Sequence, residues 1–162
     1  MDKSKLKPGN LRRIKSLALL DDDNLAAFLN YIEVVECASN ARLFSEGQPG
    51  DSMFLILEGQ MRVSTQKRAS EGAMLLRMLE PGDEFGEIAL MTQAPRTATV
   101  EATQPSVLLK ITFGALQKLM DEQPALAAYF LFHVARTLGR ELGDLTSKLR
   151  ARTEQSDLLS NF

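Results

Sequence analysis

The segment from Glu33 to Ile111 is divided into short runs of β-branched and other apolar residues, and turn residues separate the runs at short intervals. Helical spacing occurs before this segment and returns after Thr112. Many short strands separated by turns are typical of an antiparallel sandwich or roll. The sequence therefore predicts an α+β fold that is mainly β: an antiparallel β-roll of the double-stranded β-helix (jelly-roll) kind, with an N-terminal helix and C-terminal helices.

The spacing of apolar residues also predicts the individual elements. We expect strands over residues 33–37, 41–44, 53–58, 60–65, 73–79, 97–102 and 106–111. Helices are expected over residues 22–31 and 113–122, and a longer helix is expected to begin near Pro124, because proline is favoured in a first helical turn. Alternating steps of four and three residues mark a heptad seam in this last helix, which favours pairing with another helix: Leu131, Ala135, Leu138, Leu142, Leu145 and Leu149.

Composition limits the number of domains and the cellular compartment. A chain of 162 residues that is 44% hydrophobic can bury one sizeable core. We expect a basic, solvated leader over residues 1–16 whose second half enters a helix, a folded domain over 17–150 and a tail over 151–162. A single cysteine, Cys37, and the lack of a signal-like or membrane-spanning apolar stretch predict a cytoplasmic protein. The net charge of −2 provides no global attraction to nucleic acid.

The segment from Gly82 to Val100 has the features of a site for a phosphate and a sugar. A glycine-bearing turn, Phe85-Gly86-Glu87, leads into the apolar stretch Ile88-Ala89-Leu90. The first amides of a helical turn are unpaired donors that attract anions. Arg96 follows at the start of a β-type run, and a guanidinium fits the oxygens of a phosphate, whereas the carboxylate of Glu87 can accept a hydrogen bond from a ribose hydroxyl.

This segment resembles the phosphate-binding cassette of the cyclic-nucleotide-binding domain family. A second segment, from Leu43 to Gly59, is similar to the glycine-punctuated entry into the β-roll of that family, and the resemblance covers about residues 17–145. It implies that Glu87 holds the ribose 2′-hydroxyl and that Arg96 holds the exocyclic oxygens of the cyclic phosphate. The ligand-binding residues that it implies are Phe85, Gly86, Glu87, Ile88, Ala89, Arg96, Thr97 and Ala98.

Recognition of the base is less constrained by the sequence. The resemblance assigns it to the helix after the roll, where the polar candidates are Arg136, Thr137, Arg140 and Glu141, although these residues suit the solvated flank of a coiled coil equally well. On the roll, an apolar wall for the purine is expected from Met61, Val63, Met74 and Leu76, which core packing would also explain. Thr97 leaves the base undecided, so the expected ligand is cAMP, with cGMP as the alternative.

The resemblance implies a sensor that does no chemistry. We expect the bound cyclic nucleotide to reorder the cassette and to move the C-terminal helix, which signals to a partner protein in trans and pairs with a second copy of the chain. No cofactor or metal is expected. The single histidine, His133, lies outside the predicted roll and argues against a metal-dependent enzyme on a related scaffold.

Two further functions remain open. The chain could be the sensor half of a truncated transcription regulator; the residues after Arg150 are too few for a helix-turn-helix module, so we expect no DNA binding by this chain. It could also be a structural or partner-binding β-roll that needs no small ligand, although such a protein would tolerate the loss of Glu87 and Arg96.

Overall fold

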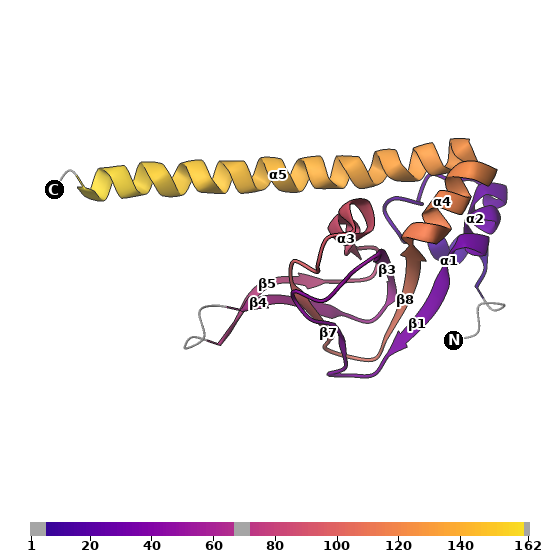
Figure 1. The fold of residues 1–162 in the computed structure, drawn as a ribbon, viewed down its shortest axis with the longest axis horizontal. Helices are drawn as coiled ribbons and strands as arrows, with labels where there is room; N and C mark the ends of the chain where they lie inside the picture. The colour runs from indigo at the N-terminus through magenta and orange to yellow at the C-terminus, as the bar shows by residue number, and fades with distance from the viewer. Residues whose placement is uncertain (1–5, 67–71, 161–162) are drawn as a thin grey trace.

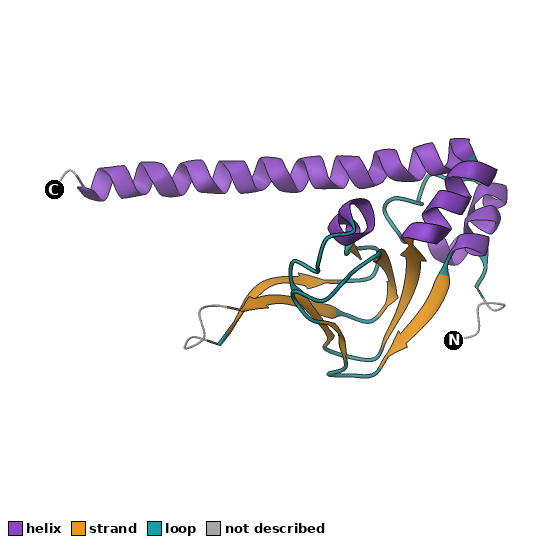
Figure 2. Ribbon diagram, in the orientation of Figure 1, coloured by secondary structure: helices purple, strands orange, loops and turns teal. Residues whose placement is uncertain are grey.

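A computed structural model of the chain describes residues 6–66 and 72–160, with side chains described as far as Thr153. Two four-stranded antiparallel sheets form the roll (Figure 2). The first has the order β1 (Glu33–Cys37), β8 (Ser106–Thr112), β3 (Ser52–Glu58) and β6 (Glu84–Phe85), and the second has the order β2 (Arg42–Phe44), β7 (Thr99–Ala102), β4 (Met61–Gln66) and β5 (Ala73–Leu79). The predicted fold class is confirmed. The two-residue strand β6 was not predicted, because so short a segment has no periodicity.

Strand β3 is buried on both faces and separates two apolar clusters. Because side chains alternate along a strand, Phe54 and Ile56 pack between the sheets, whereas Met53 and Leu55 pack against the helices. A continuous apolar run in the sequence therefore marks the strand that joins the two halves of the core.

Helices cover one end of the roll (Figure 1). They are α1 (Pro8–Leu11), α2 (Asp22–Phe28) with the 3₁₀ turn η2 (Leu29–Tyr31), α4 (Phe113–Glu122) and α5 (Pro124–Ser160). Side-chain caps begin two of them: Asp21 accepts a hydrogen bond from the amide of Asn24, and Thr112 accepts one from the amide of Ala115. As predicted, α5 begins at Pro124.

The predicted leader and tail both need correction. Within the described residues 6–16, the side chains of Leu11 and Ile14 are fully buried in the helical part of the core, so this segment is not a solvated leader. At the other end, α5 continues through residue 150 to Ser160, so no boundary separates a tail there. Residues 1–5 and 161–162 lie outside the described residues. Among the described helices, none is long and apolar enough to cross a bilayer.

Candidate functional site

A cavity of about 670 Å³ lies between the second sheet, helix α3 (Glu87–Thr92) and the distal half of α5. All eight residues that the sequence predicted as ligand-binding line it: Phe85, Gly86, Glu87, Ile88, Ala89, Arg96, Thr97 and Ala98. The remaining lining residues are Phe44, Val63, Leu76, Arg77, Leu79, Glu84, Val100, Glu141, Asp144, Leu145 and Lys148. The predicted cassette thus forms one wall of the cavity, and α5 forms the facing wall.

Arg96 is held in a fixed position in this wall. Its Nη1 donates to the carbonyl oxygen of Ser52 at 2.5 Å, and its Nη2 donates to Ser52 Oγ at 2.9 Å. The guanidinium carbon lies 4.2 Å from the centre of the Phe44 ring, a distance typical of a cation–π contact. Backbone hydrogen bonds on both sides of Arg96, to Gly47 and Gln48, join it to the turn before β3. The two segments that were singled out in the sequence therefore meet at this residue.

Among the described residues, the charge of Arg96 has no ion-pair partner. Only 7% of the residue is exposed, its Nε makes no hydrogen bond with any described residue, and no described carboxylate forms a salt bridge with it. Burial lowers the pKa of the guanidinium, whereas the charge of nearby Asp51 raises it. A buried cation without a counterion is costly, so this arrangement favours the binding of an anion.

Gly86 connects β6 to α3 and allows the backbone to approach Arg96. Its φ of 83° is in the left-handed region, and a Cβ at this position would lie 2.9 Å from Arg96 Nη1. As the N-cap of α3, Gly86 supplies no side-chain acceptor, so the first amides of the helix have no side-chain cap.

Glu87 is the first residue of α3, and it is partly buried in the cavity wall. Burial is the main factor that raises its pKa, and the charges of Glu141 and Glu84 raise it further. Glu84 itself accepts a hydrogen bond from the amide of Ser16 at 3.0 Å, and burial raises its pKa as well. The cavity therefore has a carboxylate side and a guanidinium side.

One face of α5 closes the cavity. Glu141, Asp144, Leu145 and Lys148 are three or four residues apart and thus lie on the same side of the helix. Of the predicted base contacts, Met74, Arg136, Thr137 and Arg140 do not line the cavity, whereas Glu141, which belonged to the same group of candidates, does. Thr137 and Arg140 precede Glu141 and Asp144 by one turn, so these two candidates lie one helical turn before the part of α5 that lines the cavity.

Comparison with known proteins identifies the family. A family model described as the cyclic nucleotide-binding domain matches residues 34–123. The chain belongs to this family. The match contains the cassette, Arg96, the roll from the second residue of β1 onward and helix α4, which confirms the resemblance inferred from the sequence. The cyclic nucleotide-binding domain is a regulatory domain, and this chain has its architecture.

Individual relatives are regulators. The "CRP-like cAMP-activated global transcriptional regulator" of Mycobacterium tuberculosis is 27% identical over 122 residues, which are 75% of this chain and 54% of the regulator. A "cAMP-dependent protein kinase regulatory subunit" of Yarrowia lipolytica is 30% identical over 101 residues, which are 62% of this chain and 25% of the subunit. The chain thus spans about half or less of the length of these relatives.

A solved structure shows the same fold. The N-terminal domain of a transcriptional regulator from Streptomyces coelicolor superposes with a TM-score of 0.72 at 33% identity, over 85% of this chain and 94% of that domain.

Several residues of the cavity were not found from the sequence. Arg77 is one of them, and it is the neighbour in β5 of Leu76, which was expected in the apolar wall. Both residues line the cavity, although successive strand residues normally point to opposite faces. The pairing of β4 with β5 explains this, because Val63 pairs with Arg77 and Ser64 pairs with Leu75, which leaves Leu76 as an extra residue in a bulge. The apolar run of β5 gave no indication that Arg77 would face the cavity, and the acidic Glu84 resembled an ordinary turn residue.

No group of three or more histidine, cysteine, aspartate or glutamate side chains that could hold a metal ion occurs within residues 6–66 and 72–153. The site is therefore described by its guanidinium, its carboxylates and its apolar wall.

Proposed function

We propose that this protein binds a cyclic mononucleotide, cAMP in the first place, in the cavity between the cassette and α5, and that it does not alter the nucleotide chemically. The observation that carries the proposal is the buried guanidinium of Arg96, which lines the cavity and forms no ion pair with any residue that the structure describes. A cyclic phosphate is a monoanion with two exocyclic oxygens, which suits a guanidinium whose position is already fixed by Ser52 and Phe44.

The other lining residues fit the remaining parts of such a ligand. In the proposed complex, Glu87 accepts the ribose 2′-hydroxyl, and the amides of Ile88 and Ala89 with Thr97 complete the phosphate site. Val63 and Leu76 line the cavity from the sheet and offer the apolar surface on which a purine would lie. Leu145 of α5 would cover the opposite side of the base.

The names of the two relatives above support cAMP as the ligand. cGMP remains the alternative, since Thr97 does not select the base and since the Glu141 and Asp144 carboxylates could accept hydrogen bonds from either purine. The ligand-independent β-roll is a weaker alternative, because it gives no reason to bury a guanidinium that has no carboxylate partner among the described residues.

The output is proposed to be conformational. The ligand touches both walls of the cavity, so it can favour one position of α5 over another by its differential affinity for the two states. The exposed leucines of α5, Leu142, Leu145 and Leu149, support a homodimer that forms through this helix. The signal would pass to another protein in trans. We also propose a cytoplasmic location, because the thiol of Cys37 is free.

Calorimetric titration tests the ligand assignment. Protein that has been unfolded and refolded to remove carried-over nucleotide is titrated with cAMP and with cGMP. We expect micromolar or tighter binding of cAMP, and Arg96→Ala should weaken it by about 2–5 kcal/mol because a fixed partner of the phosphate is lost.

Arg62→Ala serves as the matched control, since Arg62 of β4 lies in an ion pair with Glu101 of β7 and does not line the cavity. It should bind like the wild type. Tighter binding of cGMP would assign the other base. No binding of either nucleotide, or equal binding by Arg96→Ala and the wild type, would refute the proposed site.

A further inference from the structure

The distal half of α5 crosses the cavity without burying any side chain. Every described residue from Gly139 to Thr153 is exposed, although four of them line the cavity. Figure 1 shows α5 as a straight helix that passes over α3 and β5 and extends beyond the roll. Because burial contributes little to the position of this half of the helix, specific polar contacts have a large relative influence on where it lies.

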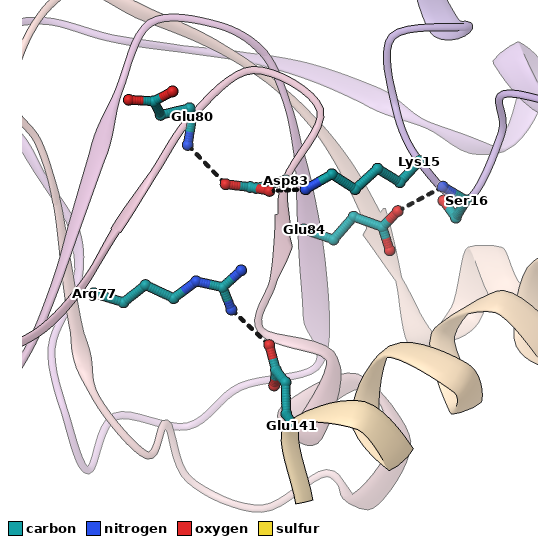
Figure 3. A network of polar contacts seen from close by, with 7 residues as sticks. All are labelled: Lys15, Ser16, Arg77, Glu80, Asp83, Glu84 and Glu141. Atoms are coloured by element: carbon teal, nitrogen blue, oxygen red, sulfur yellow. Dashed lines mark hydrogen bonds and ion pairs between the residues drawn. The ribbon is translucent and has the colours of Figure 1, made fainter. Parts of the chain in front are cut away.

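One such contact joins it to the roll. Arg77 Nη1 of β5 lies 2.5 Å from Glu141 Oε1 of α5, and both residues line the cavity (Figure 3). Among the described side chains, this is the single ion pair between α5 and the roll. The bulge at Leu76 brings Arg77 to this wall, so the contact depends on an irregularity of β5.

The charges around the pair favour its formation. Glu84 and Glu87 lie in the same wall as Arg77, and the charge of Arg77 lowers the pKa of Glu87 against the effect of burial. Arg77 is therefore the cation near both Glu87 and Glu141, whereas Glu84 is influenced by His133 and Lys15. If Arg77 were absent, the carboxylates of Glu87 and Glu141 would repel each other. Glu141 would move away, because it lies on the exposed half of α5.

We infer that Arg77 and Glu141 are positioning residues: their ion pair ties the distal half of α5 to the rim of the cavity and thereby controls how far the cavity opens. The tie follows from the geometry alone. Its effect on the ligand, which is slower release of cyclic nucleotide while the tie is closed, rests on the proposed function.

The tie can be tested without any ligand. Spin labels are attached at Ala38→Cys on the turn after β1 and at Arg152→Cys on α5, both exposed positions, in a Cys37→Ala background. Pulsed electron paramagnetic resonance then measures the distance distribution between the labels, after dilution with unlabelled protein to remove distances between two copies. The doubly labelled protein without further changes is called the parent, and we expect one narrow distance distribution for it at low salt. Glu141→Gln and Arg77→Gln should each broaden it, since either change removes half of the pair.

Two comparisons separate the tie from a general effect on the fold. The exchanged pair, Arg77→Glu with Glu141→Arg, should restore the narrow distribution because it restores the attraction. Glu101→Gln, which removes the exposed pairs with Arg42 and Arg62, should leave it unchanged. About 1 M salt should broaden the parent distribution, since the Debye length falls to about 3 Å. An unchanged distribution in Glu141→Gln, or an exchanged pair that stays as broad as the single variants, would overturn the inference.

The consequence for the ligand is measured as the dissociation rate of a fluorescent cAMP analogue after addition of excess cAMP. Half-exposed ion pairs contribute little energy, so Glu141→Gln should release the analogue about 1.5 to 5 times faster than the wild type at low salt. An equal rate would overturn the role of the tie in ligand release. If no analogue binds to the wild type, the proposed function fails, whereas the distance measurement still decides whether the tie exists.

Discussion

Gly50 packs so closely against Arg96 that a Cβ at position 50 would lie 2.6 Å from the Nε of Arg96. The same Cβ would lie 2.9 Å from the Cβ of Ala89 in α3. The turn before β3 therefore contributes to the cavity by its lack of a side chain, since this lack allows the guanidinium to lie between the turn and the cassette.

Gly50→Ala is expected to move the guanidinium away from Ser52 and to overpack this region. The free energy of unfolding should fall by about 1–3 kcal/mol, and cAMP affinity should fall on the order of tenfold or more. Urea denaturation and calorimetric titration measure the two effects. Gly114→Ala is the control, because a Cβ there meets no atom within 4 Å. If Gly50→Ala bound cAMP as tightly as the control, the position of Arg96 would not depend on this packing.

The residues before α2 are expected to contribute to stability as core residues. Leu11→Ala or Ile14→Ala should lower the free energy of unfolding by about 2–5 kcal/mol, because each side chain is fully buried. Leu19→Ala removes the same type of side chain from a position that is 81% exposed, so it should change stability by less than about 0.5 kcal/mol. Chemical denaturation of the three variants makes the comparison, and equal effects at Leu11 and Leu19 would contradict the packing described here.

Glu87→Gln is expected to stabilise the fold while it weakens ligand binding. Burial raises the pKa of Glu87 above its ordinary value of 4.5, so the folded state holds the proton more tightly than the unfolded state does. The ionised Glu87 therefore costs stability above its raised pKa, and this cost disappears below about pH 4.5. The stability gain of the glutamine variant should be largest near neutral pH and vanish as the pH falls. Affinity for cAMP should decrease by roughly 1–3 kcal/mol.

Glu101→Gln is the control, because its expected effect on the free energy of unfolding has the opposite sign. Hydrogen bonds from Arg62 and Arg42 lower the pKa of Glu101, so its ionised form stabilises the folded state above its ordinary pKa. The glutamine variant should lose stability near neutral pH, and the loss should disappear as the pH falls through the lowered pKa. Thermal unfolding at several pH values compares the two variants. If both variants changed the free energy of unfolding in the same direction, burial would not be the main factor that sets the pKa of Glu87.

Pairing through α5 predicts an effect on oligomeric state. Leu142 and Leu149 are 66% and 55% exposed, so Leu142→Glu with Leu149→Glu should place like charges in the proposed dimer seam without disturbing the core. Sedimentation velocity should show a dimer for the wild type and a monomer for the double variant, with unchanged circular dichroism. Ser147→Glu, an exposed position on the side of the same helix opposite to Leu142 and Leu149, should remain dimeric. A monomeric wild type would refute the seam.

The sequence was sufficient for the fold class and for the cassette. Each strand of the roll except β6 is an apolar or β-branched run bounded by turn residues, and the helices after Thr112 begin at residues that favour helix starts, Thr112 and Pro124. The cassette could be located because its turn, its carboxylate and its guanidinium lie within one short segment. All eight residues predicted from that segment line one cavity.

The sequence alone determined which chemistry is present, because turn glycines, strand alternation and helix caps act between residues that are close along the chain. Tertiary structure alone decided three further features: the burial of Leu11 and Ile14, the bulge that brings Arg77 to the cavity, and the turn of α5 that faces it. Each depends on the fit between segments that are far apart in the sequence. A shift of one residue in β5 or of one turn in α5 leaves the local pattern almost unchanged and yet alters every contact across the cavity.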